Sequence, residues 1–150
     1  MTADTVSRQP VVLVCTTCGG ASTPAGMPPP GLILARSVAA SLGPAGDVRV
    51  EGVRCLANCS RGPSAAIRCE RAWTYVFGPL DEARDGPALV AGARLLAAAA
   101  DGLLPWRDRP EVLKRAVIAR LPPANTPGVA IELGEAAEAG QAARGPGAEQ

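Results

Sequence analysis

The sequence predicts an α/β fold in which one mixed β-sheet packs against helices. A short apolar run is followed by an amphipathic segment and then by an alternating run, which is the order strand, helix, strand. Two further β-rich runs separated by a polar dipeptide predict a hairpin, and a second amphipathic segment follows it. The length of 150 residues suits one domain.

The first strand is expected at Val11-Val12-Leu13-Val14, because a β-branched run without alternation is typical of a strand covered on both faces. A loop follows, since the prolines at 24, 28, 29 and 30 cannot lie inside a helix. Apolar residues then recur at helical spacing from Gly31 to Leu42, where Gly43-Pro44 ends the predicted helix. Val48-Arg49-Val50-Glu51 alternates like a half-exposed strand.

The hairpin is predicted over residues 65–69 and 72–77, with a tight turn at Glu70-Arg71. Leucine and alanine then repeat every three or four residues, which predicts a second helix from about Pro87 to Gly102. The hairpin also contains most of the aromatic side chains of the chain.

The segment after Trp106 predicts a short third helix that closes the domain. Asp108 can cap this helix and Pro110 suits its first turn. Its apolar face would comprise Val112, Leu113, Ala116 and Val117. The basic residues on the other side are interpreted either as a solvated helix face or as a docking surface for an acidic redox partner; they are Arg109, Lys114, Arg115 and Arg120.

This order of elements is the minimal thioredoxin-like plan: strand, helix and strand, then hairpin and helix. Parallel strands joined by a crossover place their carboxyl ends on the same edge of the sheet. The domain is expected to span residues 10–123. Residues 1–9 are polar, and the tail 124–150 is a low-complexity segment rich in Ala, Gly, Pro, Glu and Gln, so both are expected to be disordered.

Composition excludes several classes of function. The chain contains no histidine, which rules out Ser-His-Asp and Cys-His catalysis, mixed Cys/His zinc sites and Rieske ligation. A net charge of +1 and an aromatic content of 3% argue against a nucleic-acid partner. No apolar stretch is long enough for a signal peptide or a bilayer span, so we expect a cytoplasmic protein without a membrane partner.

Four of the five cysteines form two pairs, and each pair directly follows a predicted strand. Cys15 and Cys18 come after the first strand, and Cys55 and Cys59 come after the second. Because those strand ends share an edge, the four thiolates are expected to converge on a metal centre. Cys69 lies within a predicted strand and is interpreted as a small buried hydrophobe.

The segment Cys55-Leu56-x-x-Cys59-x-x-Gly62-Pro63 resembles the second ligand pair of thioredoxin-like [2Fe-2S] ferredoxins, a group that includes the small iron-sulfur subunit of respiratory complex I. Over residues 11–123 the chain is also similar to a bacterial domain of unknown function. The motifs CTTC, CLANCSRGP, WTYVFG, PWRDRPE and ARLPP carry this similarity. Members of that family are often labelled metal-binding proteins and encoded near cobalamin-biosynthesis genes.

The resemblance implies a [2Fe-2S] cluster held by Cys15, Cys18, Cys55 and Cys59. It further implies a one-electron carrier with a link to cobalamin metabolism, which would serve redox partner proteins that the sequence does not identify. We expect glycine to let backbone amides approach the cluster, at Gly19, Gly20 and Gly62, and Pro63 to help fix the second loop. Nearby arginines could raise its potential, namely Arg54, Arg61, Arg68 and Arg71.

Two alternatives to the cluster remain open. Four thiolates also suit Zn²⁺ in a structural interaction module or a metal carrier. A thiol-disulfide oxidoreductase is the third hypothesis. Such enzymes activate the first thiol at the start of a helix, whereas Cys18 here is followed by Gly-Gly and a proline-rich loop. With no acid/base pair and no nucleotide-binding glycine motif, the chain is not expected to be an enzyme. The sequence leaves the oligomeric state open.

Overall fold

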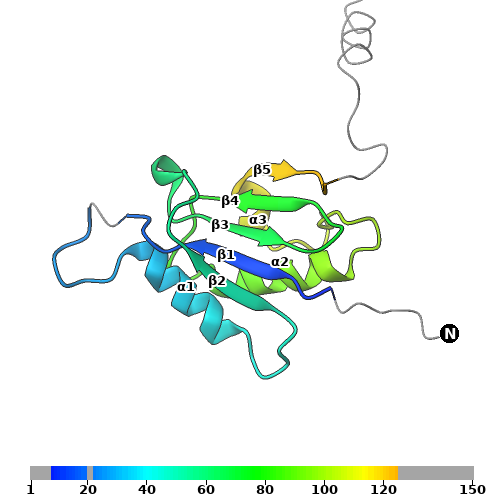
Figure 1. Cartoon of the computed structure of the whole chain (residues 1–150), viewed down its shortest axis with the longest axis horizontal. Helices are drawn as coiled ribbons and strands as arrows, with labels where there is room; N and C mark the ends of the chain where they lie inside the picture. The colour runs from blue at the N-terminus through cyan, green and yellow to red at the C-terminus, as the bar shows by residue number, and fades with distance from the viewer. Residues whose placement is uncertain (1–7, 20–21, 125–150) are drawn as a thin grey trace, which may run out of the picture.

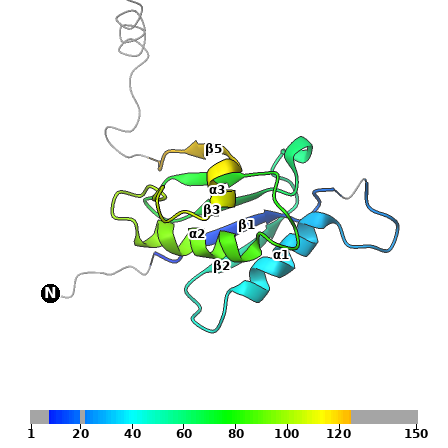
Figure 2. The same cartoon turned by 180° about the vertical axis from the view of Figure 1, so that it is seen from behind.

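The fold is α/β, with a five-stranded mixed sheet and helices packed on one of its faces (Figures 1 and 2). The computed structural model describes residues 8–19 and 22–124. The two segments expected to be disordered therefore lie outside the described residues, apart from Arg8, Gln9 and Ala124. In the described part, no helix is long and apolar enough to cross a membrane.

The sheet has the strand order β2-β1-β3-β4-β5. The central strand β1 (Val11–Cys15) runs parallel to β2 (Arg49–Val53) and antiparallel to β3 (Ala65–Arg68). The strand β4 (Thr74–Phe77) continues the sheet as the second arm of the hairpin. This arrangement confirms the thioredoxin-like order predicted from the sequence, with its single parallel pair at one side.

Helix α1 (Pro30–Ser41) forms the crossover between β1 and β2, and α2 (Gly86–Ala98) follows the hairpin. The two helices pack against each other and against the sheet (Figure 2). Both helices have proline at a first-turn position. A backbone N–H there has no partner within the helix, so its absence in proline costs no hydrogen bond. The expected boundaries hold at the start of each helix, while α2 ends four residues before Gly102.

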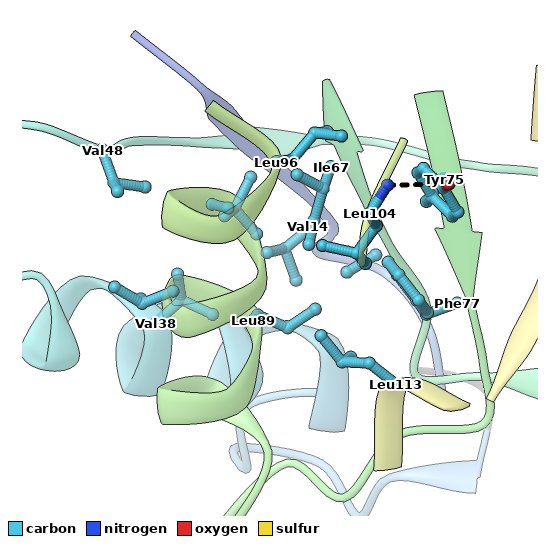
Figure 3. Packing of buried hydrophobic residues seen from close by; sticks show 14 of the residues in the cluster. Val14, Val38, Val48, Ile67, Tyr75, Phe77, Leu89, Leu96, Leu104 and Leu113 are labelled. Atoms are coloured by element: carbon cyan, nitrogen blue, oxygen red, sulfur yellow. Dashed lines mark hydrogen bonds between the residues drawn. The ribbon is translucent and has the colours of Figure 1, made fainter. Parts of the chain in front are cut away.

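The core lies between the sheet and these helices (Figure 3). Val12 and Val14 point into it from β1, whereas Leu13 on the other face is half-buried. Val11 and Cys15 on that other face are buried, so the expected burial of β1 is confirmed except at Leu13. Tyr75 is buried there as well, and its hydroxyl accepts the N–H of Leu104 at 3.0 Å, which satisfies both groups.

The end of the domain differs from the prediction. Helix α3 covers only Glu111–Arg115, and the chain then forms a fifth strand, β5 (Val117–Leu121), antiparallel to β4. Val117 and Ile118 are β-branched and favour a strand. Because β5 also pairs with the outer backbone groups of β4, those groups gain partners that a longer helix would not supply. Arg120 accordingly lies on a strand and stacks over the Trp73 ring at 4.5 Å.

Two leucines in this region provide a matched test of the packing. Leu113 of α3 is fully buried in the core, whereas Leu121 of β5 is 51% exposed. We expect Leu113→Ala to lower the free energy of unfolding by about 2–5 kcal/mol, because it leaves a cavity against α2. The same substitution at Leu121 should change it by no more than about 0.5 kcal/mol.

Urea unfolding followed by circular dichroism measures both variants under the same conditions. Equal losses of stability at Leu113 and Leu121 would contradict the placement of α3 in the core.

Candidate metal centre

Both cysteine pairs lie at one edge of the sheet, where β1 and β2 end (Figure 1). Cys15 pairs with Val53 in the parallel register. The loop that contains Cys18 and the loop that contains Cys55 therefore begin at the same end of the two strands. The loops are joined by the N–H of Thr16, which donates to the Val53 carbonyl at 2.9 Å, and by the Thr17 hydroxyl, which donates to the Arg54 carbonyl. The first pair and the second loop are thus held against each other.

The Cys15 side chain lies directly against the second loop. Its sulfur is 3.8 Å from the Arg54 carbonyl oxygen and 3.9 Å from the Thr17 hydroxyl. Burial by itself would raise the pKa of the Cys15 thiol. Hydrogen bonds from the Cys18 side chain and from the N–H groups of Leu56 and Thr17 outweigh this effect, so the pKa of Cys15 lies below its ordinary value.

Cys18 shows the opposite behaviour. Burial raises the pKa of its thiol, and the hydrogen bond that this thiol donates to Cys15 raises it further. Of the two thiols, Cys15 is therefore the one that loses its proton more readily. A soft metal that binds thiolates would replace that proton.

Gly62 and Ser64 surround the Cys18 sulfur from the far end of the second loop. A Cβ atom at Gly62 would lie 3.0 Å from the Cys18 sulfur, so a larger residue there would displace it. The Ser64 hydroxyl is 3.7 Å from the same sulfur. The Gly62–Pro63 peptide between them is cis. The expected close approach of backbone near the cysteines is present at Gly62, and Gly20 lies outside the described residues.

Gly31 makes a second close approach, which sequence reasoning missed. A Cβ atom there would lie 1.9 Å from the Cys15 carbonyl oxygen, and the Gly31 N–H donates to the Cys18 carbonyl at 3.2 Å. Only glycine lets the first turn of α1 pack this closely on the loop of the first pair. Gly31 could have been suspected from its place immediately after three prolines at the start of a predicted helix.

Cys55 and Cys59 are exposed, in contrast to the first pair. The N–H of Ala57 donates to the Cys55 sulfur at 3.1 Å, and Ala57 itself has a left-handed φ of 56°. Cys59 begins a 3₁₀ turn, Cys59–Arg61, in which the Arg61 N–H donates to the Asn58 carbonyl at 3.0 Å. Both side chains of the second pair are therefore accessible to solvent.

The described residues contain no ready-made group of three or more His, Cys, Asp or Glu side chains that would hold a metal ion. The chemistry of the donor set nevertheless fits a thiolate-bound centre. Two buried thiols lie at the end of β1, and two exposed thiols lie on the loop that contacts both of them.

The four arginines expected to act on the centre lie at opposite ends of the sheet. Arg54 and Arg61 lie in the second loop and are exposed. Arg68 and Arg71 do not lie near the cysteine pairs, because β3 runs antiparallel to β1 and carries them to the opposite end of the sheet. Their expected effect on the centre is therefore wrong.

Cys69 lies at that same far end, where it is buried and its thiol donates to the Arg8 carbonyl at 3.4 Å. Its expected burial is confirmed.

The chain was compared with known proteins. A solved structure described as a thioredoxin-like [2Fe-2S] ferredoxin from Aquifex aeolicus matches with a TM-score of 0.49 at 15% identity, covering 79% of this chain and 98% of that one. No curated protein matches the sequence. The family model described as "Protein of unknown function (DUF1636)" matches residues 12–123. This match covers β1 from its second residue, the other four strands and the three helices named above, and the chain belongs to that family.

Proposed function

We propose that this protein is a small iron-sulfur protein that carries one electron on a [2Fe-2S] cluster held by Cys15, Cys18, Cys55 and Cys59. The observation that carries the proposal is the parallel pairing of β1 with β2, which brings both cysteine pairs to one edge. The sulfur of Cys15 already lies against Arg54 and Leu56, the two residues on either side of Cys55.

The donor set suits this cluster chemically. A two-iron cluster takes two thiolates for each metal, and this chain offers two pairs. When bound, the cluster would supply one-electron chemistry. Arg54 and Arg61 are exposed on the second loop, and their positive charge would favour the more negative reduced state.

Thiol-disulfide exchange is less well supported by the site. The lowered pKa of Cys15 would suit a nucleophilic thiolate. Cys15 and Cys18 are, however, only 1% and 2% exposed, so a disulfide substrate cannot reach either sulfur in this conformation. The exposed pair, Cys55 and Cys59, would also have no role in that reaction.

A zinc-binding protein is the second candidate function. Zn²⁺ accepts four thiolates, and the exposure of Cys55 and Cys59 would suit a carrier that releases its metal to a partner. An iron-sulfur cluster and a zinc ion would use the same four ligands. The identity of the bound metal therefore distinguishes the two candidate functions.

An electron carrier needs partner proteins, and we propose that a reductase or an acceptor enzyme docks where Cys55 and Cys59 are exposed. No catalytic acid/base pair forms part of this proposal. A role in cobalamin metabolism stays a prediction, since it comes from the resemblance alone.

Purification without air provides the first test of this proposal. We expect a brown protein that absorbs in the visible range and contains about two iron and two acid-labile sulfide per chain. Metal analysis and absorption spectroscopy measure both properties. A colourless preparation with zinc as its metal would contradict the cluster and support the second candidate.

Serine substitutions test the ligand set. Replacing any one of the four paired cysteines by serine should strip or destabilise the centre, because a hydroxyl is a poor ligand for a soft metal. Cys69→Ser is the matched control and should keep the full metal content, since Cys69 lies at the opposite end of the sheet. A full metal content after Cys59→Ser, or its loss after Cys69→Ser, would overturn the assignment.

A further inference from the structure

Ser64 is a fully buried polar residue between Pro63 and the start of β3. Apart from the hydroxyl of Tyr75, it carries the one fully buried hydroxyl among the described residues. A hydroxyl is costly to bury without a hydrogen-bond partner. The partner here is the Cys18 sulfur, 3.7 Å from the Ser64 hydroxyl oxygen.

The backbone of Ser64 also contacts the first cysteine pair. Its carbonyl oxygen accepts the N–H of Cys15 at 3.0 Å. One residue therefore holds the main chain of Cys15 and the side chain of Cys18. Gly62, two residues earlier, leaves just enough room for the Cys18 sulfur to approach this segment.

The Ser64 hydroxyl can donate to the Cys18 sulfur with or without a bound metal. In the metal-free protein the Cys18 thiol donates its own proton to Cys15 in a hydrogen bond, which leaves its sulfur free to accept from Ser64. A metal-bound thiolate has no proton, so the Ser64 hydroxyl must then be the donor. Hydrogen bonds to a charged acceptor are stronger than neutral ones, and this one strengthens as negative charge on the sulfur increases.

We propose that Ser64 is a positioning residue that donates a hydrogen bond to the metal-bound Cys18 sulfur and thereby raises the reduction potential of the centre. This inference rests on the proposed function. On reduction one electron passes from an external reductant, dithionite in the test below, to the centre. The Ser64 hydroxyl keeps its proton throughout, and it favours the reduced state because the sulfur then carries more negative charge.

Ser64→Ala tests the role of the hydroxyl with little change of volume. The matched control is Ser60→Ala, because Ser60 is exposed on the same loop. Iron, sulfide and circular dichroism are measured first, and the midpoint potential is then measured by titration with dithionite. We expect Ser64→Ala to keep its cluster and to disfavour reduction about tenfold, a lowering of about 59 mV for one electron. Ser60→Ala should keep the wild-type potential.

Ser64→Thr retains the hydroxyl and should restore most of the potential. Three results would overturn the proposal: a wild-type potential in Ser64→Ala, an equal shift in Ser60→Ala, or a folded Ser64→Ala protein that no longer assembles the centre. The last result would give Ser64 a role in assembly and not in tuning.

Cobalt loading separates a failure of this inference from a failure of the proposed function. If the wild-type protein contains zinc and no iron, the proposed cluster is wrong. The wild-type and Ser64→Ala proteins are then loaded with Co²⁺. Loss of the hydrogen bond should make the Cys18 sulfur a stronger electron donor and shift the sulfur-to-cobalt absorption band to lower energy. An unchanged band would overturn the role of Ser64.

Discussion

The parallel pairing of β1 with β2 is the constraint on which the candidate centre depends. It brings the Cys15 sulfur against the Arg54 carbonyl although these residues are 39 positions apart in the chain. The crossover helix α1 makes this pairing possible, and Gly31 lets the helix start directly over the Cys15–Cys18 loop. The antiparallel strands β3, β4 and β5 then complete the sheet, and the segment that leads into β3 contains Gly62 and Ser64.

The two cysteine pairs differ in their surroundings, and this difference gives the centre an inner and an outer side. Cys15 and Cys18 are buried, and the main chain of Cys15 is hydrogen-bonded to Ser64. Cys55 and Cys59 stand on an exposed loop with one left-handed residue, Ala57, and a single 3₁₀ turn. A buried inner pair with an accessible outer pair is compatible with the proposed electron carrier, whose partners would approach from the exposed side.

The sequence predicted the elements correctly where the local residue pattern and the packing in the fold favour the same structure. The strand-helix-strand start and the hairpin were readable from periodicity, and topology then placed the cysteines at one edge. The strand β5 was not readable, because residues 112–117 also match a helical face and the pairing with β4 decides their state. Proximity in sequence misplaced Arg68 and Arg71, which β3 carries away from the centre. Ser64 gave no local signal, since its role depends on Cys18, 46 positions earlier.

The central claim is that the four cysteines hold a two-iron cluster that accepts one electron. A reductive titration of the anaerobically purified protein, followed by electron paramagnetic resonance, tests it most directly. The account predicts a silent oxidised protein that gains a spin-one-half signal as about one electron per chain is added. A protein that takes up no electron, gives no signal and contains zinc would contradict it.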